Sequence, residues 1–295
     1  MNILTLDIGG TAVKSGTFSD GRLVAFEEFP TQAKQGADFM VDNICTYIRE
    51  KHPDAVGIST SGQVDPTDGS IAFATDAMPG YTGFPLQRYV AEQTGLPTVV
   101  ENDVNSAAIG EAHFGAAQGL SDFLCLTYGT GIGGAVFING QLYKGVNGVA
   151  GEVGHIITHY NGHPCNCGGK GCYETYASTS ALVRRAEETL GKKVTGRDLY
   201  ASRTEAAVSM LLDQWADEIV AGLTSLTHTF NPQALILGGG LMSQPEIISL
   251  VQNKFADRVL PSFSKAKILA AQLGNQAGIY GAYVLAASAD KHQNF

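Results

Sequence analysis

A cluster of cysteines is the clearest chemical signal in the sequence. Three of the five cysteines lie within eight positions of the stretch "HPCNCGGKGCYE", residues 163–174, namely Cys165, Cys167 and Cys172. They are too close together to link distant elements, and in a reducing compartment such a cluster is more typical of a metal site than of disulfides. Three thiolates and one imidazole fill a tetrahedral zinc shell and leave no open position, so we expect a structural zinc ion.

The imidazole of this site could come from any of three nearby histidines, which are His155, His159 and His163. Only one residue separates His163 from Cys165, which makes it hard for both side chains to bend around one ion. The chemistry of the residues does not otherwise choose among the three. A zinc knuckle unrelated to any substrate is the alternative interpretation of the whole segment.

A glycine turn near the N-terminus could bind phosphate. In "LDIGGTAVK", Asp7 ends an apolar strand, and Gly9, Gly10 and Thr11 form the turn before Lys14. Backbone N–H groups exposed by glycines, together with a hydroxyl and an ammonium group, can surround phosphate oxygens. Asp7 could hold the accompanying magnesium ion, usually through water.

Two further glycine turns follow strands later in the chain. "YGTGIGG" contains Gly129, Thr130, Gly131 and Gly133, and "LGGGL" contains Gly238–Gly240. An ordinary hairpin explains any one of them equally well, but three such turns together favour a nucleotide site. None of them has the G-x-x-x-x-G-K-[ST] spacing, so the chain is not a P-loop protein.

A group of polar residues stands where a buried-looking strand meets a helix, in "VVENDVNSAAIGE". Asn102 or Asp103 could simply cap the helix. A cap needs only one such residue, however, and three polar residues stand here in a row, because Glu101 precedes Asn102 and Asp103. Transfer of a phosphoryl group to an alcohol needs a carboxylate that accepts the hydroxyl proton, and Asp103 is the best-placed candidate. Asn102 could then hold another hydroxyl.

The composition limits the class of protein. The chain has 295 residues, of which 44% are hydrophobic and 16% charged, and its net charge is −9. This acidity argues against nucleic-acid binding, and no apolar run approaches the roughly 18 residues that span a bilayer. The start "MNILTLDIGG" lacks the features of a secretory signal, so we expect a cytoplasmic protein without a membrane partner. Cys45 and Cys125 are predicted to be buried core residues.

The elements that must position these residues alternate between strands and helices, which predicts an α/β fold. Strands are expected around residues 2–18, 55–60, 97–103, 123–143 and 233–238, and helices at 36–53, 84–95, 104–117, 180–191, 204–230 and 244–255. The strand–turn–strand unit of the N-terminus returns about 120 residues later, at "FLCLTYGTGIGGAVF". This repetition suggests two related lobes. The helix around Trp215 is expected to belong to the core.

Taken together, these segments resemble the ROK family of bacterial sugar kinases and sugar-responsive repressors. The resemblance rests on "DIGGTAVKSG", "ENDVNSAAIGE", "TYGTGIGGA", "GVNGVAGEVGH", "CNCGGKGCYE" and "LGGG", which occur in the family's order and cover almost the whole chain. It implies a two-lobed, actin/hexokinase-type (ribonuclease-H-like) fold. The expected N-terminal lobe is 1–112, completed by the helix 277–295, and the C-terminal lobe is 113–276 with a zinc loop at 155–174.

The resemblance also implies roles for individual residues. ATP and a sugar would meet in the cleft between the lobes, with Asp103 as catalytic base. The residues expected to bind the sugar are Gly62, Asn102, Asp103, Glu152, His155 and Glu174. Those expected to bind ATP with Mg²⁺ are Asp7, Gly9, Gly10, Thr11, Lys14, Thr130, Gly131, Gly133, Gly239 and Gly240. The family pattern selects His155 to complete the zinc shell of Cys165, Cys167 and Cys172, so that the zinc would brace the substrate pocket.

The substrate is suggested by smaller similarities. "DAMPGYTGFPL" and "TSGQVD" depart from the common glucokinase pattern, whereas "IGGTAVKSG", "LCLTYGTGIGG" and "GNQAGIYGA" are similar to the family's β-glucoside kinases. Those enzymes phosphorylate the 6-hydroxyl of the non-reducing glucose in disaccharides such as cellobiose. Glucose and N-acetylmannosamine are the alternatives.

Two other classes of protein are the alternatives to a kinase. A ROK repressor would carry a helix-turn-helix before the first strand, whereas this sequence starts on that strand. A non-catalytic sugar sensor of the same family is a further alternative. A zinc-binding interaction module would not need Asp103 or two phosphate turns. The family resemblance further suggests a homodimer.

Overall fold

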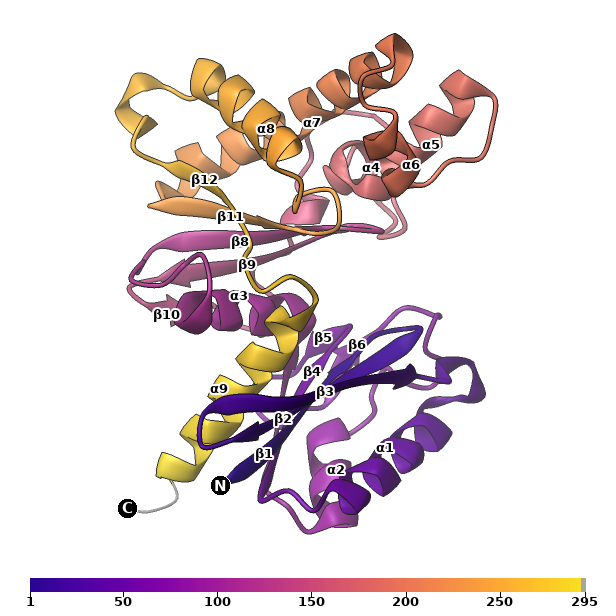
Figure 1. The fold of residues 1–295 in the computed structure, drawn as a ribbon, viewed down its shortest axis with the longest axis vertical. Helices are drawn as coiled ribbons and strands as arrows, with labels where there is room; N and C mark the ends of the chain where they lie inside the picture. Colours follow the sequence, from indigo (N-terminus) through magenta and orange to yellow (C-terminus); the bar gives the residue numbers. More distant parts are fainter. Residues whose placement is uncertain (293–295) are drawn as a thin grey trace. The chain divides into compact units, whose positions relative to one another are not determined.

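The computed structural model describes residues 1–292, which form two compact units. Unit 1 contains Met1–Gln118, Lys144–Ala150 and the chain from Asn275 onward, and unit 2 contains Gly119–Tyr143 and Gly151–Gly274. Both units combine a five-stranded sheet with helices, so the predicted two-lobed α/β class is confirmed (Figure 1).

The sheet of unit 1 has the strand order β3-β2-β1-β4-β7. Strands β1, β2 and β3 pair antiparallel, and β1, β4 and β7 pair parallel. The strands are β1 Asn2–Ile8, β2 Ala12–Ser19, β3 Arg22–Pro30, β4 Ala55–Thr60 and β7 Thr98–Asn102, and the pair β5 Gln63–Val64 and β6 Ile71–Phe73 lies outside this sheet. The helices are η1 Ala33–Gln35, α1 Ala37–Lys51, α2 Leu86–Thr94, α3 Asp103–Phe114, η4 Gly274–Gln276 and α9 Ala277–His292, and η4 begins on the last residue of unit 2.

The two faces of this sheet bury different side chains because successive residues of a strand point in opposite directions. On β1, Leu4 and Leu6 belong to the core that contains residues of α1 and α2. Ile3 belongs to a second cluster, which includes Ile279 of α9. The apolar alternation of the N-terminal sequence therefore separates two helix layers, and Asp7 lies on the same face as Ile3.

Helix α9 packs closely on the sheet and on α3 because glycines replace side chains at the contacts. A Cβ atom at Gly57 of β4 would collide with the Ala282 carbonyl, and one at Gly281 would collide with the Ser106 carbonyl. Either collision is too close for real Cβ atoms, so larger residues at these positions would push the helix away. Helix α9 is thereby fixed over the strand ends that carry the polar residues described below.

The sheet of unit 2 has the order β10-β9-β8-β11-β12, again with an antiparallel hairpin region and a parallel region. Its strands are β8 Phe123–Tyr128, β9 Ile132–Ile138, β10 Gln141–Leu142, β11 Ala234–Gly238 and β12 Lys267–Ala270. Its helices are η2 Val153–His155, α4 Glu174–Ala177, α5 Thr179–Leu190, α6 Gly196–Ala201, α7 Ala206–Phe230, α8 Pro245–Arg258 and η3 Pro261–Phe263. In Figure 1 helices α4 to α8 gather on one side of this sheet.

The repeat predicted from the sequence corresponds to a shared topology. Each sheet begins with a hairpin whose first strand also pairs parallel with a later strand, so β1 corresponds to β8 and β2 to β9. The core of unit 2 includes Trp215 of α7, which is 2% exposed and donates its indole N–H to the Ala177 carbonyl at 2.8 Å. Its assignment to the core is confirmed, as is the burial of Cys45 and Cys125.

The helix boundaries follow local signals. Helix α1 ends at Lys51, and its C-cap His52 adopts the left-handed conformation before Pro53; α2 ends at Thr94, and its C-cap Gly95 has φ 71°. The sequence did not predict β3, β12 or α6. Residues 144–150 were expected in the C-terminal lobe but lie in unit 1, where a Cβ atom at Gly148 would contact Pro66. Within residues 1–292, every helix is too short or too polar to cross a bilayer.

Candidate functional site

A row of polar side chains crosses unit 1 at the carboxyl ends of three parallel strands. Asp7 of β1 is in register with Ser59 of β4, which is in register with Glu101 of β7. Registered residues of parallel strands point to the same face, so the three side chains follow one another across the sheet. The Ser59 hydroxyl donates to Asp7 Oδ1 at 2.8 Å. The ends of parallel strands are where α/β proteins place their ligands.

The first glycine turn lies beside this row. The Gly9 N–H donates to the Ala12 carbonyl at 3.0 Å, and Thr31 donates its hydroxyl to the Gly9 carbonyl at 2.7 Å. A Cβ atom at Gly10 would meet nothing within 4 Å, so the turn is open on that side. Lys14, which pairs with Asp7 across the hairpin, places its ammonium nitrogen 3.3 Å from Asp7 Oδ2. The predicted phosphate residues of this turn are therefore close together.

Asn102 is the N-cap of α3. Its side-chain oxygen Oδ1 accepts the N–H groups of Val104 and Asn105 at 3.0 and 3.1 Å, so the capping interpretation of this residue is confirmed. Its amide group donates to the Gly62 carbonyl and to Asp103 Oδ1, both at 2.9 Å. The side chain thus has protein partners for both its donors, and a sugar hydroxyl would have to replace one of them.

Asp103 is the first residue of α3 and lies near Asp7. Burial of the carboxyl group and the negative charge of Asp7 raise the pKa of Asp103 from 3.8 to about 6, although the Val104 N–H bound to its Oδ1 at 2.9 Å acts in the opposite direction. A carboxylate with a pKa of about 6 is mostly ionised at pH 7 and more basic than an exposed aspartate. Both properties suit a general base.

The segment around Gly62, whose carbonyl accepts from the Asn102 amide, is held in place by polar contacts. Gly62 has φ 102°, and a Cβ atom there would contact the Phe73 carbonyl at 2.7 Å, so only glycine fits. Tyr81 is fully buried, and its hydroxyl lies 2.8 Å from the Thr60 hydroxyl, while Thr82 bonds the backbone N–H of Ala74 at 2.9 Å. Tyr81 and Thr82, which distinguish this loop from the common glucokinase pattern, therefore brace it.

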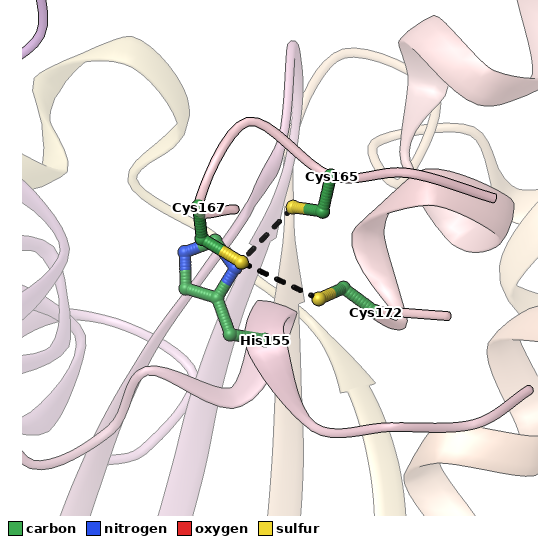
Figure 2. A group of neighbouring side chains, drawn as sticks. All are labelled: His155, Cys165, Cys167 and Cys172. Carbon is green, nitrogen blue, oxygen red and sulfur yellow. Dashed lines mark hydrogen bonds between the residues drawn. The ribbon is translucent and has the colours of Figure 1, made fainter. Parts of the chain in front are cut away.

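In unit 2 the three cysteines and one histidine converge, as Figure 2 shows. The ligand atoms of His155, Cys165, Cys167 and Cys172 all lie within 4.8 Å of one another. The Cys167 and Cys172 sulfur atoms are 3.6 Å apart, and the Cys165 sulfur is 3.7 Å from His155 Nδ1. Zn–S bonds of about 2.3 Å in a tetrahedron place sulfur atoms about 3.8 Å apart. The donor set and its spacing therefore fit a structural zinc ion.

The structure chooses His155 among the three candidate histidines. His159 instead stacks on the Tyr176 ring, with 3.8 Å between ring centroids. His163 stacks on the same ring, with 4.8 Å between centroids. His155 Nδ1 points to the sulfur atoms, whereas its Nε2 lies 3.8 Å from Glu152 Oε2. One ring nitrogen can thus bind metal while the other remains on the side of Glu152.

Glu174 links the cysteine loop to the second glycine turn. One of its carboxylate oxygens lies 3.2 Å from the Cys165 sulfur and 3.8 Å from His155 Nδ1. The other accepts the Ile132 N–H at 3.3 Å and would be struck by a Cβ atom at Gly131. Glu152, His155 and Glu174, which the sequence predicts to bind sugar, therefore form one group.

A cavity of about 370 Å³ lies next to this turn within unit 2. It is lined by Tyr128, Gly129, Thr130, Thr179, Ser180, Val183, Arg184, Glu187 and Gly240. Gly239 has φ 114°, and a Cβ atom there would collide with the Tyr128 carbonyl, so the "LGGG" turn can approach β8 only with glycine. Two predicted nucleotide residues, Thr130 and Gly240, thus share a cavity large enough for a nucleoside.

Several residues of the site were missed from the sequence. Ser59, which orients Asp7, stands in "GISTSG" without a motif that marks it. The α5 residues that line the cavity, among them Arg184 and Glu187, have the pattern of an ordinary amphipathic helix. Only the placement of α5 beside the glycine turn shows that they border a cavity.

The fold and the two groups of residues define a class of protein. Each of the two α/β units has a glycine turn after its first strand; unit 1 adds a carboxylate at a strand end, and unit 2 adds a cluster that could bind zinc. This is the construction of an ATP-dependent carbohydrate kinase, and relatives of this class are found. A glucokinase of Streptomyces coelicolor is 36% identical over 315 residues, covering 97% of each chain. A β-glucoside kinase of Listeria monocytogenes is 31% identical over 294 residues, covering 96% of each chain.

A solved structure agrees with these relatives. The ROK family glucokinase from Streptomyces griseus, in complex with glucose and AMPPNP, superposes with a TM-score of 0.85 at 35% identity, over 98% of this chain and 100% of that one. The ROK family model matches residues 3–289. The chain belongs to the ROK family, so the predicted family and enzyme class are confirmed.

Proposed function

We propose that this protein transfers the γ-phosphoryl group of ATP to the primary hydroxyl of a glucosyl unit, with Asp103 as the general base. The observation that carries this proposal is the position of Asp103, a carboxylate of raised pKa at the end of β7 beside Asp7. In the reaction the Asp103 carboxylate takes the hydroxyl proton while the sugar oxygen bonds to the γ-phosphorus. The bond from that phosphorus to the bridging oxygen breaks, and ADP leaves.

The nucleotide is assigned to the glycine turns. Gly10 and Thr11 would donate to phosphate oxygens, while Gly9, whose N–H donates to the Ala12 carbonyl at 3.0 Å, would shape the turn around the phosphate. Lys14 would be the nearby cation, and Asp7 the residue that holds magnesium. Magnesium supplies charge neutralisation on the phosphates when it is bound. The remaining assignments are Thr130, Gly131 and Gly133 for phosphate, and Gly239 and Gly240 for adenosine, and the cavity beside Thr130 and Gly240 supports them.

The sugar is assigned to Gly62, Asn102 and Asp103 together with Glu152, His155 and Glu174. The shared contacts of the last three residues support this assignment, because one carboxylate lies on each side of the His155 ring. Zinc bound by His155 and the three cysteines would hold the ring in place and has no open position for substrate. The zinc is thus a brace, and the acid–base chemistry belongs to Asp103.

A β-glucoside such as cellobiose is the proposed substrate, with glucose as the second candidate. Both activities occur in the names of relatives at similar identity, the β-glucoside kinase at 31% and the glucokinase at 36%. The sequence similarities around the glycine turns favour the β-glucoside. N-acetylmannosamine, a sugar-sensor role and a homodimer remain predictions of the same family resemblance.

The test is an ADP-release assay on glucose, cellobiose, gentiobiose, a β-aryl glucoside, N-acetylmannosamine and allose, with zinc and magnesium present. We expect turnover on cellobiose or gentiobiose to exceed that on glucose by at least about tenfold, a difference of about 1.4 kcal/mol in transition-state binding. A preference for glucose or N-acetylmannosamine would keep the mechanism and reject the β-glucoside. Absence of turnover on the whole panel would contradict the kinase proposal and favour a sugar sensor.

A further inference from the structure

The segment Lys144–Ala150 follows β10 of unit 2 in the chain but is part of unit 1. Its first residue, Lys144, forms an ion pair with Glu101, the last residue but one of β7. The Glu101 side chain is 4% exposed, whereas the Lys144 side chain is 37% exposed. The lysine therefore reaches from the surface to a carboxylate that lies inside the unit.

Glu101 is tied to the turn that carries the proposed base. Its Oε1 accepts the backbone N–H of Asn102 at 2.9 Å and the side-chain amide of Asn105 at 3.0 Å. Its other oxygen faces the Lys144 ammonium group. The carboxylate thus clamps the last residue of β7 and the first turn of α3 on either side of Asp103.

The clamp needs a cation. A carboxylate that is buried without a positive partner is strongly disfavoured, and it responds by taking up a proton or by moving towards water. Either response would loosen the bonds to Asn102 and Asn105. The other nearby ammonium group, that of Lys14, lies 3.3 Å from Asp7 Oδ2 and is therefore paired with Asp7 and not with Glu101. Asp103 itself is bound by neutral N–H groups, those of Asn102 and Val104.

We infer that Lys144 is a positioning residue for the phosphoryl transfer: by neutralising Glu101 it keeps the Asn102–Asp103 turn in the geometry that the base requires. The pair differs from a surface salt bridge, whose contribution is small, because one partner is almost completely buried and also holds two further hydrogen bonds. Lys144 needs no contact with the sugar or with ATP in this role. The inference rests on the proposed role of Asp103.

The test compares Lys144→Met, Lys144→Arg and the double variant Lys144→Met/Glu101→Gln with the wild-type enzyme. Glutamine is neutral but keeps the oxygen that accepts from Asn102 and Asn105, so the double variant restores the clamp without a cation. Lys51→Met is the matched control, because Lys51 of α1 pairs at 2.5 Å with Glu27 of the exposed strand β3 in the same unit. The readouts are kcat, the KM values for sugar and ATP, and the thermal midpoint.

We expect Lys144→Met to lower kcat by roughly ten- to hundredfold, the range that a misplacement of about 1 Å produces, with little change in the KM for ATP. Lys144→Arg and the double variant should recover kcat to within about threefold of the wild type, and Lys51→Met should leave it unchanged. A Lys144→Met enzyme that melts earlier but keeps its kcat would show a structural role only and overturn the inference.

Two further outcomes are distinguishable. If the double variant stays as slow as Lys144→Met, Lys144 acts on the substrates directly, and the positioning role is rejected. The variant Asp103→Asn is measured in the same series. If it keeps its kcat, the proposed base is wrong, whereas an inactive Asp103→Asn enzyme beside a fully active Lys144→Met enzyme rejects the inference alone.

Discussion

Replacing Asp103 by asparagine should affect activity and stability in opposite directions. Asparagine keeps a side-chain oxygen that can accept from the Val104 N–H, which Asp103 Oδ1 accepts at 2.9 Å, so the start of α3 is preserved. What disappears is the proposed proton acceptor. General-base catalysis contributes about 10²- to 10⁴-fold, so we expect kcat to fall by that factor while the KM for sugar changes little.

The pH dependence of the wild-type enzyme follows from the raised pKa. With the pKa of Asp103 at about 6, the carboxylate is about 90% ionised at pH 7 and about 10% ionised at pH 5. The value of kcat/KM should therefore decline about tenfold per pH unit below pH 6. It should be measured from pH 5 to 8.5 at constant ionic strength, with the residual activity of Asp103→Asn as the control that lacks this limb.

The stability effect has the reverse sign. Because the pKa rises from 3.8 in the unfolded chain to about 6 in the fold, Asp103 stabilises the fold only while it is protonated. This contribution is complete below pH 3.8 and is lost as the pH rises through 6. At about 1.36 kcal/mol per pKa unit the cost of the ionised group at pH 7 is at most about 3 kcal/mol, and solvent screening of the half-buried side chain reduces it to about 1–2 kcal/mol.

Asp103→Asn should thus be more stable than the wild type at pH 7 and equally stable near pH 3.8. Urea unfolding at the two pH values measures the difference. In the kcat/KM profile, an acid limb near pH 4 in the wild type, or an acid limb near pH 6 that persists in Asp103→Asn, would refute the assignment of the base. A variant less stable than the wild type at pH 7 would refute the argument about burial.

Two more predictions concern unit 2. Cys167→Ser removes one thiolate of the cluster, so metal analysis should find less than one zinc per chain. The thermal midpoint should fall by several degrees, and the KM for sugar should rise at least about tenfold. Full zinc content would contradict the assignment of the ligands. Gly131→Ala places a methyl group against the Glu174 carboxylate and should displace it, which should raise the KM for sugar by about tenfold. An increase confined to the KM for ATP would show instead that Gly131 acts only on phosphate.

Local signals made much of the protein predictable. Helix α1 stops before Pro53 and α2 before its C-cap Gly95, because proline cannot continue a helix and glycine readily adopts the left-handed conformation that ends one. The three candidate thiolates of the metal cluster could be found from spacing, since residues a few positions apart in a loop cannot separate widely, whereas spacing left three histidines open as the fourth ligand. The short edge strand β12 was missed because four residues of mixed polarity carry too little periodic signal.

The sequence by itself determined the family, through its motifs, and it named candidate groups for the site: the cysteine cluster and the carboxylate at the end of β7. Only the tertiary structure decided how these groups are used. It turned His155 Nδ1 toward the sulfur atoms, committed Asn102 to the cap, and placed Ser59 beside Asp7 and Lys144 beside Glu101. The Ser59–Asp7 and Lys144–Glu101 contacts join parts of the chain that are distant in sequence, 52 residues apart for Ser59 and Asp7. No local spacing encodes the electrostatic environment that sets a pKa or a cation's partner.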